Sequence, residues 1–188
     1  MRTMRWLLIF GVALACAHAL AAEDEDFGVA PSTGLRVMEL SAPTPREIPG
    51  AKILLTGDLR LRLQGDAERR PLLFDVLGGE PHHSLPGAIW LPGAGRGEST
   101  GDAVQVQLSR LLQAATKGSL DRPIAFFCQG VRCWLSYNAA LRAVALGYRE
   151  VYWYRGGIEA WLAAGEALAP LRFSWRRPLP EGTPAKAP

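Results

Sequence analysis

The sequence lacks several patterns that mark particular protein classes. Beyond residue 22 no apolar stretch is long enough for a transmembrane helix. No Cys-x-x-Cys-His motif occurs, which excludes covalent attachment of a c-type haem. The glycine-rich stretch at 93–97 lacks the Gly-Lys-Ser/Thr of a phosphate-binding loop and the Gly-x-Gly-x-x-Gly fingerprint, so nucleotide binding is not indicated.

The sequence also has little excess charge. Its formal net charge of +3 falls to +1 without Arg2 and Arg5, so there is no electrostatic drive toward nucleic acid. What the 188 residues do have is 48% hydrophobic and 21% charged side chains, a balance typical of one soluble globular domain.

The N-terminal segment has the pattern of an export signal. Two arginines precede an apolar run at 6–17, and small residues that suit a signal peptidase follow it. We therefore expect residues 1–22 to be a signal peptide. The mature protein would then begin with a solvated acidic arm at 23–50 and lie in an oxidising compartment, the bacterial periplasm.

From residue 51 onward, short apolar runs alternate with segments of helical character. The expected strands are 52–55, 72–76, 88–91, 124–127 and 151–154, and the expected helices are 58–64, 102–116, 133–146 and 158–164. Strands this apolar need cover on both faces, which a parallel sheet between helices provides. The sequence therefore predicts an α/β domain over 51–175, followed by a disordered proline-rich tail at 176–188.

One loop between a strand and a helix carries the residues best suited to chemistry. Cys128 follows the expected strand 124–127, at the edge of the sheet where α/β proteins bind ligands. The turn amides, the helix dipole and Arg132 all favour the thiolate of Cys128. We therefore expect Cys128 to be a nucleophile whose anionic substrate binds to the backbone of Gln129, Gly130, Val131 and Arg132. A buried structural cysteine is the alternative.

Two further residues are candidates for substrate binding. Asp75 and Arg155 lie at the ends of other expected strands and hence on the same edge of the sheet as Cys128. Arg155 would add a second positive charge there, unless it is a solvated loop arginine. A zinc site that combines the cysteines with His82 and His83 is not favoured, because adjacent histidines rarely converge on one ion. We expect no metal and no other cofactor.

Motifs along most of the chain resemble the rhodanese homology domain. They are Phe74-Asp75-Val76, Leu85-Pro86-Gly87-Ala88-Ile89, the loop from Cys128 to Arg132, Leu146-Gly147-Tyr148, Gly156-Gly157-Ile158 and Ala160-Trp161-Leu162. The resemblance implies a rhodanese-like three-layer fold, with a central, mostly parallel five-stranded sheet flanked by helices, and an activity of the thiosulfate sulfurtransferase type. The loop departs from the family pattern in having one residue fewer before its arginine and a second cysteine, Cys133, directly after it.

A narrower resemblance concerns the exported CXXCW-motif proteins. It rests on the stretch 85–95, on Cys133-Trp134 and on Ser136-Tyr137-Asn138-Ala139-Ala140. The resemblance implies a role in catabolism that depends on pyrroloquinoline quinone (PQQ), with a quinoprotein dehydrogenase as a partner.

Cys133 leaves two interpretations open. Two cysteines that flank a short loop can form a disulfide when their Cα atoms come within about 7 Å, and the bond would persist in an oxidising compartment. In the reduced protein, Cys128 would attack a sulfur donor and Cys133 would resolve the product, by transfer to a thiol acceptor or by thiol–disulfide exchange. In the oxidised protein, the pair would belong to a non-catalytic or thiol-redox accessory module.

Overall fold

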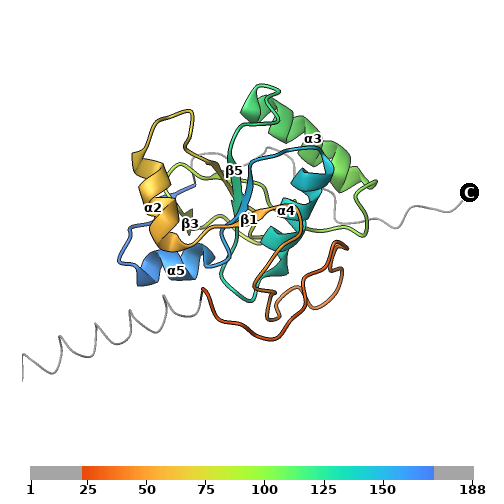
Figure 1. The fold of residues 1–188 in the computed structure, drawn as a ribbon, viewed down its shortest axis with the longest axis horizontal. Coiled ribbons are helices and arrows are strands. Elements are labelled where there is room, and N and C mark those ends of the chain that lie inside the picture. The colour runs from red at the N-terminus through yellow and green to blue at the C-terminus, as the bar shows by residue number, and fades with distance from the viewer. Residues whose placement is uncertain (1–22, 172–188) are drawn as a thin grey trace, which may run out of the picture.

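The computed structural model describes residues 23–171, so the expected signal peptide and proline-rich tail lie outside the described residues. Five strands form one sheet in the order β1-β6-β5-β2-β4, and every neighbouring pair is parallel (Figure 1). Their bounds are β1 Lys52–Ile53, β2 Leu72–Asp75, β4 Ile89–Trp90, β5 Ile124–Phe127 and β6 Val151–Trp153. The predicted α/β fold with a five-stranded parallel sheet is confirmed.

Helices cover both faces of the sheet (Figure 1). Helices α3 (Ala103–Thr116) and α4 (Trp134–Ala145) pack on one face, and α2 (Thr56–Gln64) and α5 (Gly157–Ala163) pack on the other. Successive residues of a strand point to opposite faces, so each strand supplies two cores. Along β6, Trp153 joins the core under α4, as its alternation predicts, while Tyr152 and Tyr154 join the core under α2 and α5.

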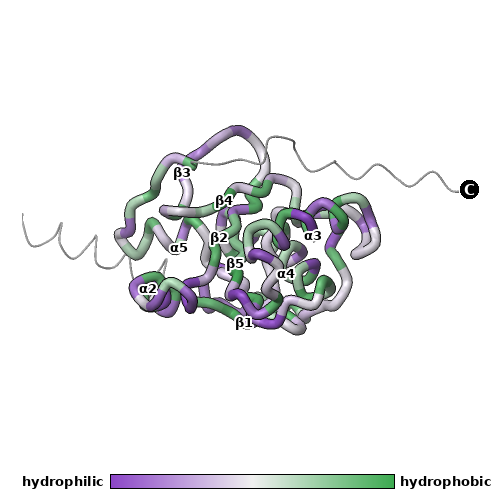
Figure 2. The backbone as a smooth tube through the Cα atoms, turned by 90° about the horizontal axis from the view of Figure 1, so that it is seen from above, coloured by the Kyte–Doolittle hydropathy of each residue, from purple (hydrophilic) through white to green (hydrophobic). Residues whose placement is uncertain are grey.

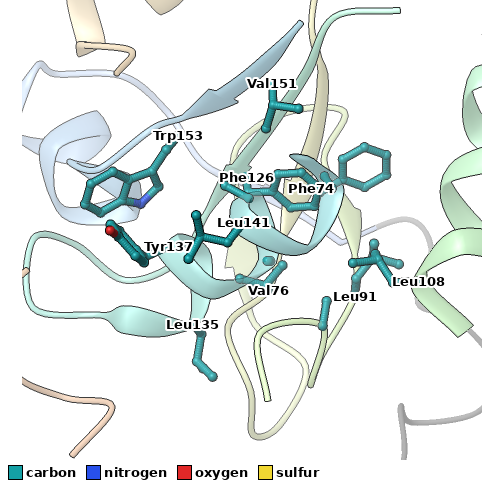
Figure 3. Close-up of a cluster of buried hydrophobic side chains, with 14 of the residues drawn as sticks. Phe74, Val76, Leu91, Leu108, Phe126, Leu135, Tyr137, Leu141, Val151 and Trp153 are labelled. Carbon is teal, nitrogen blue, oxygen red and sulfur yellow. The ribbon is translucent and has the colours of Figure 1, made fainter. Parts of the chain in front are cut away.

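The larger core lies between the sheet and the α3–α4 layer (Figure 3). Phe74 and Phe126 stack with their ring centroids 5.4 Å apart, and Tyr137 of α4 meets Trp153 edge-on at 5.1 Å. Figure 2 shows hydrophobic residues along the central strands β2 and β5, with hydrophilic stretches on α2 and α3. Full burial of each large apolar side chain contributes about 1.5–3 kcal/mol, so the two cores fix the sheet and thereby the loops at its carboxyl edge.

A small second sheet was not predicted from the sequence. Strand β3 (His83–Ser84) pairs antiparallel with β7 (Ala169–Pro170). Strands of two residues are too short for an alternating pattern, which is why the sequence gives no sign of them. Within residues 23–171, no helix has both the length and the apolar character needed to cross a membrane.

Much of the segment 23–50 is exposed, but it does not lie free in solvent as the expected solvated arm would, because its backbone is hydrogen-bonded to α4. We call this segment the N-terminal strap, and Figure 1 shows it in red to orange, passing the end of α4. The hydroxyl of Tyr137 accepts from the N–H of Ser32 and donates to the C=O of Ser32, both at 2.8 Å. The side-chain amide of Asn138 accepts from the N–H of Arg36 at 3.0 Å and donates to the C=O of Arg36 at 2.7 Å. The strap thus satisfies polar groups of α4 that would otherwise be buried without partners.

Candidate active site

Cys128 and Cys133 form a disulfide across the loop between β5 and α4. Their Cα atoms are 6.4 Å apart, and the two residues are only 1% and 8% exposed. The hydroxyl oxygen of Ser136 lies 3.3 Å from Sγ of Cys128 and accepts a hydrogen bond from Nε1 of Trp153 at 3.0 Å. Of the two states that the sequence leaves open, the structure holds the oxidised one. In this state Cys128 has no free thiol, so the predicted nucleophile would require reduction of the disulfide.

The first half of the loop is held by helix α5, whose N–H groups donate to carbonyl groups of the loop. The carbonyl of Cys128 accepts from the N–H of Ile158 at 3.0 Å, and that of Gln129 accepts from the N–H of Glu159 at 2.9 Å. Gly157 makes this contact possible, because it has φ of +57° and a Cβ there would lie 2.2 Å from the carbonyl oxygen of Cys128. In a trans peptide the C=O and the next N–H point in opposite directions, so the N–H groups of Gln129 and Gly130 point away from α5.

The strap holds the second half of the loop in the same way. The hydroxyl of Thr44 donates to the carbonyl of Val131 at 2.6 Å, and the Thr44 N–H donates to the same oxygen at 3.1 Å. The N–H of Arg132 therefore points away from the strap. Within residues 23–171, the backbone N–H groups of Gln129 to Arg132 donate to no protein acceptor. With its carbonyl groups held by α5 and the strap, the loop has amides left to bind an oxyanion.

Two exposed charges of opposite sign lie at this loop. Arg132 is exposed and forms no ion pair within the described residues, so its charge is available to a substrate. Glu159 is also exposed, and its carboxylate accepts a hydrogen bond from the side-chain amide of Gln129 at 3.2 Å. Sequence reasoning missed Glu159. The signal that could have found it is its place in the first turn of a helix that begins, like the Cys128 loop, at the carboxyl edge of the sheet.

Arg155 supports the strap. It is 1% exposed and donates to the carbonyl groups of Glu23, Glu25 and Thr44 at 2.8–3.0 Å, and to the Thr44 hydroxyl at 3.1 Å. Burial lowers the pKa of Arg155 from its usual value. The expectation of a solvated loop arginine is wrong, and the donors of this guanidinium are engaged by the protein.

Asp75 is fully buried, and the structure does not bring it together with Cys128. It pairs in register with Phe127, whose side chain belongs to the core under α2 and α5, whereas Cys128 belongs to the opposite core. Its carboxylate accepts from the N–H of Leu77 at 2.9 Å and from the Ser84 hydroxyl, and lies 2.9 Å from Nε2 of His82. Within residues 23–171, no three side chains of His, Cys, Asp or Glu come together as a metal site.

A cysteine loop at the carboxyl edge of a five-stranded parallel sheet, between β5 and α4, defines the protein as rhodanese-like. The chain belongs to the rhodanese-like domain family, whose sequence pattern matches residues 48–164. No curated protein matches the chain.

Three solved structures are similar to the chain. A protein of Bacillus halodurans shares 24% identity over 70% of this chain and 79% of its own, with a TM-score of 0.46. A thiosulfate sulfurtransferase from Pseudomonas aeruginosa shares 17% identity over 85% of this chain and 23% of its own, with a TM-score of 0.48. A human single-domain sulfurtransferase shares 26% identity over 60% of this chain and 95% of its own, with a TM-score of 0.37.

Proposed function

We propose that the protein transfers sulfur, with the reduced thiolate of Cys128 as its nucleophile. The observation that carries the proposal is the position of Cys128 at the start of a loop whose backbone N–H groups from Gln129 to Arg132 donate to no protein acceptor within the described residues. The thiolate attacks the outer sulfur of thiosulfate, the sulfur–sulfur bond of thiosulfate breaks, and sulfite leaves. Cys128 then carries the sulfur as a persulfide, whose negative charge the amides and Arg132 stabilise.

Cys133 gives this cycle its second step. Its thiolate attacks the inner sulfur of the Cys128 persulfide, the disulfide forms, and hydrosulfide leaves. A thiol reductant that supplies two electrons then returns both cysteines to thiols. When a thiol acceptor takes the outer sulfur instead, no disulfide forms. In this cycle the disulfide of the structure is the product of the resolving step.

A second candidate function follows from the burial of the disulfide. Because both cysteines are nearly inaccessible in the oxidised protein, the loop also suits a non-catalytic accessory module; a thiol-redox module would need a reductant that reaches these buried sulfur atoms. We further propose that the protein works in the periplasm, beside a quinoprotein dehydrogenase of PQQ-dependent alcohol catabolism. The export-signal pattern and the resemblance to the CXXCW-motif proteins support that setting. Copurification with a dehydrogenase that is unaffected by Cys128→Ser would favour the accessory module.

Intact-mass measurement tests the sulfur-transfer proposal. The protein isolated without reductant should be two hydrogens lighter than its fully reduced form. After reduction and addition of thiosulfate, Cys133→Ser should gain one sulfur atom and retain it, whereas Cys128→Ser should gain none. The wild-type protein should release sulfide and become two hydrogens lighter again. If reduced Cys133→Ser has a titratable thiol and still gains no sulfur from thiosulfate or from monoanionic benzenethiosulfonate, sulfur transfer is excluded and the accessory module becomes the better proposal.

A further inference from the structure

The carboxylate of Glu159 lies against the backbone of the cysteine loop. The backbone N–H of Glu159 donates to the carbonyl of Gln129 at 2.9 Å. The Glu159 carboxylate accepts a hydrogen bond from the side-chain amide of Gln129 at 3.2 Å. A Cβ at Gly130 would lie only 2.1 Å from Oε2 of Glu159. Backbone and side-chain contacts thus fix a full negative charge beside the peptide groups that would receive a substrate.

This charge opposes that of Arg132. A dianion such as thiosulfate is attracted by the Arg132 guanidinium and repelled by the Glu159 carboxylate, so the carboxylate offsets part of the attraction. The loop amides, which also attract a donor, are dipoles without net charge. Each additional negative charge on a donor therefore adds repulsion from Glu159, and a neutral donor feels none.

We infer that Glu159 determines specificity by selecting against dianionic sulfur donors. The carboxylate thereby reduces the advantage that a dianion would have over donors with one negative charge or none, such as a persulfide carried by a low-mass thiol or by a protein. The inference rests on the proposed function for its substrate class. The charge discrimination itself concerns only how Cys128 meets reagents of different charge.

Thiol reagents that share one reactive group and differ in charge test the discrimination. Cys128 is the only thiol in a chain that carries Cys16→Ser and Cys133→Ser, because the sequence has three cysteines. Three methanethiosulfonates react by the same step and carry a neutral methyl, an anionic sulfonatoethyl or a cationic trimethylammonioethyl group. Glu159→Gln keeps the size of the side chain and an oxygen acceptor for Gln129, and it removes the charge.

For scale, two unit charges about 6 Å apart in water at 0.1 M salt change a rate about twofold. Glu159→Gln should raise the rate ratio of the anionic to the neutral reagent about twofold and lower that of the cationic to the neutral reagent by the same factor. Both ratios should approach the parent values at 1 M salt. The matched control is Glu68→Gln, which removes an equal charge from a side chain 97% exposed before β2, at the opposite edge of the sheet, and should change neither ratio.

Sulfur donors separate this inference from the proposed function. Glu159→Gln should raise persulfide formation from monoanionic benzenethiosulfonate about twofold and that from thiosulfate about fourfold, because repulsion scales with donor charge. Shifted reagent ratios without a persulfide from either donor would uphold the discrimination and remove the sulfur-transfer function. Persulfide formation with unshifted reagent ratios would uphold the sulfur-transfer function and overturn the charge discrimination. Equal rate changes for all three reagents, or no reaction at Cys128, would overturn the inference.

Discussion

The hydroxyl of Thr44 donates to the carbonyl of Val131 at 2.6 Å and accepts a hydrogen bond from Nε of Arg155 at 3.1 Å. Thr44 is fully buried, so it joins the strap, the cysteine loop and the end of β6 in one contact. Thr44 precedes the rhodanese-like match, which begins at residue 48. This chain therefore builds one wall of its candidate active site from a segment outside the family pattern.

Replacing Thr44 tests whether the strap orients the loop. Thr44→Val keeps the shape and the backbone N–H but loses the hydroxyl, which leaves Nε of Arg155 without a partner. We expect the free energy of unfolding to fall by about 1–3 kcal/mol and persulfide formation to slow about fivefold, the effect of one hydrogen bond. Urea unfolding and intact-mass time courses measure the two quantities. Thr44→Ser, which retains the hydroxyl, should form the persulfide at the wild-type rate. A wild-type rate in Thr44→Val would show that the strap does not orient the loop.

The fold could be predicted because its strands and helices are marked by local patterns of apolar residues. The site could be predicted only in part, because several of its contacts join residues that are distant in the sequence. The predicted strand 124–127 coincides with β5, since four consecutive apolar residues mark a strand covered on both faces. The position of Cys128 followed from the order of strand, loop and helix. Thr44 and Glu159 act through partners 87 and 30 residues away in the sequence, and no local pattern records such contacts. The contacts of the strap were not predicted, because its acidic residues suggest solvation. Its backbone nevertheless supplies hydrogen-bond partners for side chains of α4.

The disulfide should contribute only modestly to stability. It closes a loop between residues five positions apart, for which the loss of chain entropy predicts about 2 kcal/mol. Reduction should therefore lower the free energy of unfolding by about that amount and leave the domain folded. Urea unfolding with and without a reductant, followed by tryptophan fluorescence, gives the difference. A domain that unfolds when reduced at neutral pH would instead assign the disulfide a structural role, which favours the accessory module.

The ion pair between Asp102 and Arg142 should make stability depend on pH. Arg142 is fully buried, and its Nη2 lies 2.7 Å from Oδ2 of Asp102. Burial alone would raise the pKa of Asp102, but hydrogen bonds from Arg142 and from the backbone N–H groups of Gln105 and Ser99 outweigh it and lower the pKa below the ordinary 3.8. The stabilisation is therefore present above pH 3.8 and is lost as the pH falls through the lower pKa of the folded state.

Asp102→Asn isolates the charge of that pair. Asparagine caps a helix as well as aspartate does, so the bond to the N–H of Gln105 is retained. At pH 7 the variant should be less stable by about 3 kcal/mol, because Arg142 stays buried without its counter-ion. Urea unfolding of both proteins between pH 7 and pH 2 should show the gap narrowing as Asp102 becomes protonated in the wild type. A gap that is constant with pH would mean that the charge of Asp102 contributes nothing.

Gly157→Ala tests whether α5 positions the loop. At φ of +57°, a Cβ on residue 157 would lie 2.2 Å from the carbonyl oxygen of Cys128 and 2.9 Å from the carbonyl carbon of Gln129. Both neighbours are backbone atoms, so the start of α5 must move away and weaken its bonds to the loop. Gly165→Ala is the matched control, since residue 165 has φ of +78° with nothing within 4 Å of the added Cβ. It incurs only the left-handed backbone cost of about 1–2 kcal/mol.

We therefore expect Gly165→Ala to lose about 1 kcal/mol of stability and to form the persulfide at the wild-type rate. Gly157→Ala should lose about 3 kcal/mol or more, because the clash adds to the backbone cost, and should form the persulfide at least tenfold more slowly. Rates are compared at a urea concentration where both variants remain folded. The displaced helix also carries Glu159 away from the loop, so the remaining reaction should discriminate less between anionic and neutral reagents. Equal rates in the two glycine variants would show that the loop holds its amides in place without α5.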